Sequence, residues 1–215
     1  MNKQTGFTLI ELAIVLVIIG LLLGGVLRGQ ELINSARVKN ITRDFQNVQV
    51  YVYGYQDRFK ALPGDDAIAA THLTGATNPI GANARNGRID GAWNSANAGD
   101  ESYLFWEHVR LAGLAPGSTN LAAPEFQPLN AAGGRIGIQS ISAGFNTITG
   151  MQGAYAVCSD LILGRDATQL DTTLDDGNTE TGNVRVVATG APGAALATAT
   201  VTQNAANQHT VCMSL

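Results

Sequence analysis

Glu11 is the single ionisable residue inside a long apolar stretch near the start of this 215-residue chain. From Leu12 to Leu27 there is no charged or strongly polar side chain, and counted from Phe7 the stretch is long enough to cross a hydrocarbon core of about 30 Å as a helix. A carboxylate in such a segment costs roughly 3 kcal/mol on insertion scales, so it is a functional candidate by default. A plain single-span anchor would account for the length but not for Glu11.

Other residues that could do chemistry do not form a catalytic pattern. The three histidines, His72, His108 and His209, are scattered, and the sequence lacks GxGxxG, GxxxxGK[ST], GxSxG and HExxH. His108 lies beside Trp106 in a predicted helix, where we expect a partly exposed structural histidine. The sequence therefore predicts that the protein is not an enzyme.

An acidic stretch late in the chain is a candidate metal site. Four carboxylates, together with amides and glycines, lie close together in the sequence, and they are Asp171, Asp175, Asp176 and Glu180. Calcium takes six to eight oxygen ligands, so this stretch could wrap a calcium ion. The alternative is a solvated acidic turn that caps a helix and leads into Val184. The turn-rich residues 81–91 fit a calcium loop less well, because Arg85 occupies a ligand position.

The first thirty residues resemble the N-terminus of type IV prepilins and type II secretion pseudopilins. Lys3 in a short polar leader, the pair Gly6-Phe7, and Thr8-Leu9-Ile10-Glu11 before the apolar run carry the resemblance. An ordinary secretory signal fits poorly, since Gly6 precedes the apolar core and no A-x-A-like site follows it. The resemblance implies that a prepilin peptidase cleaves between Gly6 and Phe7 and methylates the new amine. Glu11 would then pair with the N-terminal amine of a neighbouring subunit during assembly.

One position departs from the pattern of that family. Its members usually carry a proline about twenty-two residues into the mature chain, where this sequence has Arg28 between Gly24-Gly25 and Gly29. Each glycine in a helix interior costs roughly 1 kcal/mol relative to alanine, so the cluster could supply the local softness that proline supplies elsewhere. Because of Arg28, the helix geometry of major pilins does not carry over directly to this chain.

The resemblance also implies partners and a location. The partners are other pilin or pseudopilin subunits, the prepilin peptidase, an inner-membrane assembly platform and membrane lipid. The protein would cross the bacterial inner membrane once, hold its C-terminal domain in the periplasm, and then enter a pilus or pseudopilus filament. A formal net charge of −4 gives no basic footprint, so no nucleic-acid partner is predicted. Apart from the calcium candidate, no cofactor is predicted.

Two cysteines, Cys158 and Cys212, both follow the apolar run. They are too few and too far apart for a zinc site of the usual paired spacing. Outside the cytoplasm such a pair usually forms a disulfide, and the resemblance adds that type IV pilins often carry a C-terminal disulfide loop.

The resemblance implies a leader (1–6) and a spanning or filament-core helix (7–27), and the apolar pattern adds an amphipathic continuation (28–62) before a globular domain (63–215). The continuation carries an apolar stripe at spacings of three and four, formed by Val38, Ile41, Phe45, Val48, Val52, Tyr55 and Phe59. Leu62-Pro63-Gly64 ends it. A coiled coil is the alternative for the stripe, although only about three heptads are present.

The remaining residues predict a small sheet with long loops. Strand candidates begin at Ile136, Ala154, Val184 and Thr210; helices are expected near 67–70, 101–113 and 165–174, and a surface loop or edge hairpin over 190–207. The fold class is α+β, and the resemblance makes it pilin-like, with a long N-terminal helix on an antiparallel sheet. The predicted function is a filament subunit, major or minor, of a type IV pilus or a type II secretion pseudopilus. The alternative is a membrane-anchored periplasmic binding or adhesion module that does not polymerise.

Overall fold

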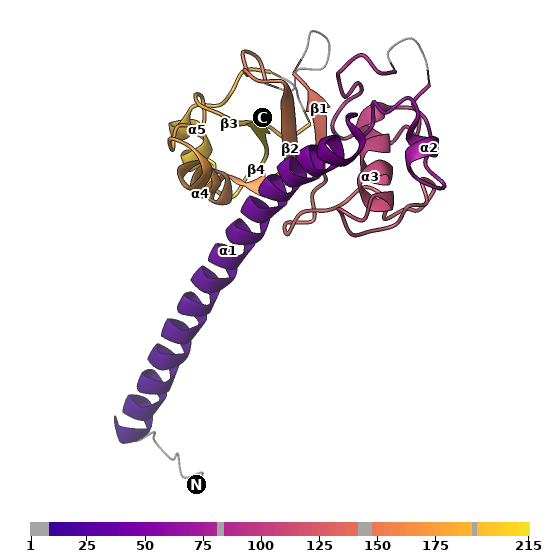
Figure 1. Ribbon diagram of the computed structural model, residues 1–215. Helices are drawn as coiled ribbons and strands as arrows, with labels where there is room; N and C mark the ends of the chain where they lie inside the picture. Colours follow the sequence, from indigo (N-terminus) through magenta and orange to yellow (C-terminus); the bar gives the residue numbers. More distant parts are fainter. Residues whose placement is uncertain (1–8, 81–83, 142–147, 191–192) are drawn as a thin grey trace. The chain divides into compact units, whose positions relative to one another are not determined.

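The computed structural model of the chain describes residues 9–80, 84–141, 148–190 and 193–215. The described chain forms two compact units, one that ends at Arg37 and one that begins at Val38. Helix α1 (Leu9–Phe59) begins in the first unit and ends in the second (Figure 1). The helix ends before Lys60, whose positive φ of 55° does not continue a right-handed helix. Pro63, which lacks a backbone N–H, follows three residues later. The predicted domain limits at residues 27 and 62 stay a prediction.

The part of α1 in the second unit buries the predicted apolar stripe. Six of its residues are buried, namely Val38, Ile41, Phe45, Val48, Val52 and Tyr55, while Phe59 is half-buried. The five from Val38 to Val52 belong to the core that also contains Phe105 from α3 and Val157 and Val211 from the sheet, whereas Tyr55 packs in a smaller cluster with Leu73 and Ala112. The period of three and four residues is therefore the signature of one buried helix face.

A four-stranded antiparallel sheet forms the centre of the second unit. Its strands are β1 (Ile136–Ser140), β2 (Tyr155–Leu163), β3 (Val184–Ala188) and β4 (Gln208–Ser214), in the order β1-β2-β4-β3. The C-terminal strand β4 thus pairs with both β2 and β3. Together with α1 this sheet confirms the predicted α+β architecture of a long N-terminal helix and a small antiparallel sheet.

The second unit also contains four shorter helices. They are α2 (Ala69–His72), α3 (Glu101–Leu111), α4 (Gly164–Leu174) and α5 (Thr198–Gln203), of which α2 lies beside α3 (Figure 1). α3 packs beside β1, whereas α4 contacts α5 and the other three strands. The helices of the second unit therefore contact the sheet in two places, α3 at β1 and α4 at the other three strands.

One sequence expectation about these elements is wrong, and one expected strand is longer than its pattern indicated. The residues 190–207 are neither a plain loop nor a hairpin, because α5 forms there and buries Val201. The strand expected to begin at Ala154 continues to Leu163 through an irregularity between Ser159 and Ile162, where Leu161 takes a positive φ of 56°. A bulge lets a strand keep its partner across a break in alternation, which periodicity alone cannot predict.

Candidate functional site

The first described residues of α1 form an apolar helical segment with exposed side chains. From Leu9 to Leu27 every side chain is exposed in the isolated chain, including Leu9 at 88 % and Leu21 at 73 %. Among the described residues, α1 is the one helix long and apolar enough to cross a membrane. Apolar surface of this extent is covered in a working protein, either by lipid or by other protein.

Glu11 lies in the first turn of α1, where a carboxylate interacts favourably with the helix dipole. Its side chain is exposed. It is the single charged residue between Leu9 and Leu27, so the helix presents one anionic group on an otherwise apolar surface. Gly6 and Phe7, the predicted cleavage and methylation residues, lie outside the described residues.

The predicted disulfide between Cys158 and Cys212 is present and fully buried. The two residues are direct partners on β2 and β4, and the bond joins positions 54 residues apart in the sequence. It fastens the C-terminal strand to the centre of the sheet. The prediction of this bond is confirmed.

Two carboxylates of the acidic stretch accept hydrogen bonds from residues of the same turn. Asp175 accepts hydrogen bonds from the backbone N–H groups of Asn183 and Val184, the latter over 2.9 Å. Asp176 accepts from the N–H of Asn178 (2.9 Å) and the hydroxyl of Thr181 (2.9 Å). These contacts correspond to the capped acidic turn that leads into β3.

Asp171 is the exception in this stretch. Its side chain is fully buried on α4, and within the described residues neither carboxylate oxygen has a hydrogen-bond partner of normal geometry. Burial raises the pKa of Asp171 to about 6, an effect that the nearby N–H of Gly177 partly offsets. Glu180 is exposed. Among the described residues no three His, Cys, Asp or Glu side chains are grouped closely enough to hold a metal ion, so calcium binding stays a prediction.

A comparison with protein families matches residues 1–27 to the prokaryotic N-terminal methylation motif. The matched region contains Gly6, Phe7 and Glu11 and the whole apolar segment of α1 up to Leu27. The chain carries the prepilin-type signal of type IV pilins and pseudopilins. No curated protein and no solved structure matches the chain.

The prepilin-type signal bears on the function of the whole chain. It supports a prepilin-processed protein similar to type IV pilins and pseudopilins, and it points to a structural protein. The apolar segment of α1 fits membrane anchoring. Processing by a prepilin peptidase and assembly with other pilin subunits follow from the same motif.

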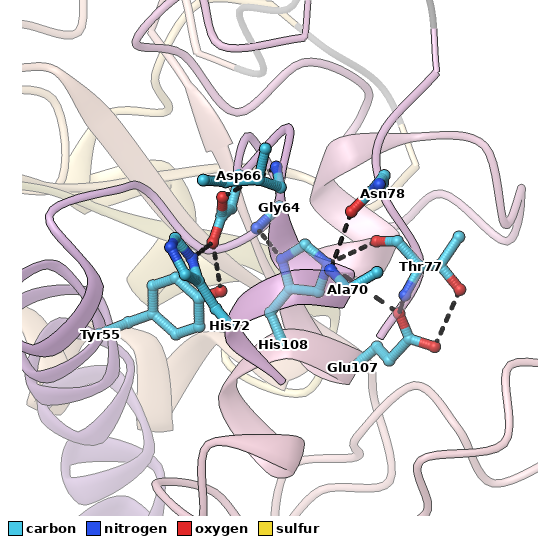
Figure 2. A network of polar contacts seen from close by, with 10 residues as sticks. Tyr55, Gly64, Asp66, Ala70, His72, Thr77, Asn78, Glu107 and His108 are labelled. Carbon is cyan, nitrogen blue, oxygen red and sulfur yellow. Dashed lines mark hydrogen bonds and ion pairs between the residues drawn. The ribbon is translucent and has the colours of Figure 1, made fainter. Parts of the chain in front are cut away.

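A buried polar network in the second unit was not predicted from the sequence (Figure 2). Asp66, which is 1 % exposed, accepts a hydrogen bond of 2.8 Å from the hydroxyl of Tyr55 and contacts Nδ1 of His72 at 2.6 Å. His72 stacks on the ring of Phe59. The last turns of α1 are thereby joined to the segment that contains α2.

The second half of the network is built on α3. His108 is fully buried rather than partly exposed, which corrects the expectation for this residue. Its neighbour Glu107 accepts hydrogen bonds from the N–H (2.8 Å) and the hydroxyl (3.1 Å) of Thr77. The signal that could have indicated this network is Pro63-Gly64-Asp65-Asp66, where two carboxylates follow directly on a helix-ending turn.

A groove of about 690 Å³ lies beside this network. Its lining includes Phe59, Lys60, Asp66, His72 and Tyr155, and its volume is in the range of small-ligand sites. None of the described residues that line the groove is a serine, threonine or cysteine.

Proposed function

We propose that this protein is a filament subunit, major or minor, of a type IV pilus or a type II secretion pseudopilus. A prepilin peptidase would cleave it between Gly6 and Phe7, and it would polymerise through the apolar part of α1. The observation that carries the proposal is Glu11, a lone carboxylate inside a helical segment that also carries the prepilin-type methylation motif. Before assembly the inner membrane would cover the segment, with the second unit in the periplasm.

The charge on Glu11 supplies the physical reason for pairing. In the filament core a carboxylate without a partner is costly, whereas one beside the cationic amine of a neighbouring Phe7 is strongly attracted to it. Methylation leaves that amine charged, so the pair would survive processing. Burial of apolar side chains supplies the affinity, and the ion pair would set the axial register of the subunits.

Replacing Glu11 tests this role. In cells that make the Glu11→Ala variant we expect normal amounts of processed protein in the membrane and loss of filaments. Glu31→Ala is a matched control, because Glu31 is an exposed carboxylate on the same helix outside the motif. Filaments of normal length and number from the Glu11→Ala variant would overturn the register role.

Pilus and pseudopilus differ in what deletion of the gene should do. The Cys158–Cys212 bond favours a pilus subunit, while Arg28 in place of proline favours a pseudopilin or a minor subunit. Loss of surface fibres on deletion would identify a pilus subunit. Retention of exoproteins in the periplasm, with no change in surface fibres, would identify a pseudopilin.

A second candidate function is supported by the groove beside Asp66 and His72. A membrane-anchored periplasmic binding or adhesion module would use such a groove for a ligand and would not polymerise. It predicts either an uncut Met1 or full function of the Glu11→Ala variant. The same variant therefore distinguishes the two proposals.

We also propose calcium as a ligand of the acidic stretch. Asp171 supports this, because a buried carboxylate without a hydrogen-bond partner is rare and a cation would supply one. Binding would require Asp175 or Asp176 to exchange an internal hydrogen bond for the ion.

A further inference from the structure

A small cavity lies between α1 and the segments that flank α3 in the second unit. Its volume is about 190 Å³, and its walls include Val48 and Tyr51 from α1, Trp106 from α3, and Pro116, Pro128 and Leu129 from the connecting segments. Sites for cofactors and drug-sized ligands are larger, about 300–1,000 Å³. The cavity has room for a single side chain rather than for a cofactor.

Asp44 is the one charged residue among the described residues that line this cavity. Its carboxylate is half-buried, and within the described chain it makes no hydrogen bond or ion pair. Burial raises the pKa of Asp44 to about 6. A partly desolvated carboxylate without a partner costs free energy that an incoming cation would recover.

Arg110 lies against one wall of the cavity but makes no ion pair with Asp44 in the described chain. Arg110 stands over the ring of Trp106 at 5.5 Å, but its guanidinium donates to the carbonyl oxygens of Pro116, Ser118 and Phe126. Its guanidinium is therefore already held by three backbone carbonyl groups. The lining also includes two aromatic residues, Tyr51 and Trp106, and aromatic rings attract cations.

We infer that this cavity is a receptacle for a lysine or arginine side chain of a second copy of this chain. The inference rests on the proposed filament, in which one surface of a subunit meets a different surface of the next. Asp44 would pair with the charged end, and Leu129, 64 % exposed at the rim, would contact the aliphatic stem.

The chain carries suitable donors for such a contact. Lys39, Arg43 and Arg88 are exposed, and their charged side chains make no hydrogen bond or ion pair in the described part of the chain. A neighbouring copy can therefore offer a basic side chain without breaking an internal contact. The cavity holds an unpaired carboxylate, and the surface of the same chain carries several unpaired basic side chains. This charge complementarity favours a second copy over an unrelated partner.

Site-specific photocrosslinking of the full-length protein in cells tests this inference. A benzophenone amino acid replaces Leu129, and the cross-linked product is identified by mass spectrometry. We expect a dimer of this chain in which the linked peptide of the partner contains a lysine or arginine. Asp44→Asn should reduce the dimer roughly tenfold, as expected when a hydrogen bond to a charged group is lost.

Two further variants separate charge from fold. Asp44→Glu keeps the charge and should keep most of the dimer. Asp57→Asn removes a carboxylate that is 92 % exposed on the same helix and should leave the dimer unchanged. Cross-linking to a different protein, or an Asp44→Asn dimer as abundant as the wild-type dimer, would overturn the inference.

Counting filaments in the same cells separates this inference from the proposed function. Filaments without a cross-linked dimer overturn the receptacle and leave the filament role intact. A dimer without filaments overturns the filament role and leaves the receptacle supported. Absence of both overturns both.

Discussion

The backbone N–H of Gly64 donates a hydrogen bond of 2.9 Å to Nδ1 of the buried His108 (Figure 2). The other ring nitrogen of His108 contacts the carbonyl oxygen of Thr77 at 2.8 Å and must donate to it. This arrangement requires a neutral imidazole, and burial lowers the pKa of His108 accordingly. The turn that ends α1 is thus fixed to α3 by a histidine with a structural role.

Gly64→Ala should destabilise the second unit by about 3 kcal/mol. Gly64 has a φ of 93°, and an added Cβ would collide with the backbone carbonyl of Glu101. Both the strained conformation and the collision would weaken the bond to His108. Thermal unfolding of the full-length protein in detergent, followed by near-UV circular dichroism, measures the change.

Gly75→Ala is the matched control for that variant. Gly75 has a similar φ of 86°, but an added Cβ meets nothing within 4 Å. It should therefore cost about 1 kcal/mol, the strain of the backbone alone. Equal losses in the two variants would show that the contact with Glu101 contributes nothing.

In the wild type the free energy of unfolding should fall as the pH rises, and Glu101→Gln should make this fall smaller. Burial raises the pKa of Glu101 from 4.5 to about 8, and the side chain shares a hydrogen bond with Asp65. At a pH between these two pKa values, Glu101 is ionised in the unfolded state but protonated in the folded state. The free energy of unfolding therefore falls as the pH rises. Glutamine can accept the N–H of Asp90, as Glu101 does over 2.8 Å, without ionising.

The comparison is of unfolding free energies at pH 5 and pH 8. We expect Glu101→Gln to be more stable than the wild type at pH 8, by on the order of 2 kcal/mol, and close to it at pH 5. Glu125→Gln, at an exposed position, should change neither value. A wild-type protein whose stability does not fall between these pH values would contradict the assigned ionisation.

Removing both cysteines should cost about 4 kcal/mol. The bond closes a loop of 54 residues, and on the entropic model a closed loop of this length constrains the unfolded chain by that amount. Cys158→Ala combined with Cys212→Ala should lower the free energy of unfolding without changing the strand register. A loss below about 1 kcal/mol would mean that β4 is held by the sheet alone.

Calcium should stabilise the second unit if the acidic stretch binds it. At one hundred times its dissociation constant a bound ion raises the free energy of unfolding by about 2.7 kcal/mol. The measurement compares melting temperatures in calcium chloride and in EDTA, with magnesium chloride as the control for ionic strength. The increase should disappear in Asp171→Asn, and an unchanged melting temperature in the wild type would exclude the site.

Periodicity and local motifs predicted the elements that depend on nearby residues. The buried face of α1 was visible as a spacing of three and four from Val38 to Tyr55, and the sheet partners Cys158 and Cys212 were visible as a pair beyond the apolar run. Glu11 was visible because a carboxylate in an apolar helix has few ordinary explanations.

What could not be predicted depends on tertiary contacts. Helix α5 lies in a glycine- and alanine-rich segment with little periodicity, and it forms where Val201 is buried. The burial of His108 and the pairing of Asp66 with His72 join segments that are distant or irregular in sequence, which no local pattern encodes. The absence of a partner for Asp44 likewise depends on how the surrounding segments pack against α1.

The intact mass of the membrane-extracted protein tests the central claim most directly. The account predicts a chain that begins at methylated Phe7 and is lighter, before reduction, by the two hydrogens lost in forming the Cys158–Cys212 bond. A chain that retains Met1 would contradict prepilin processing and leave the anchored module as the explanation.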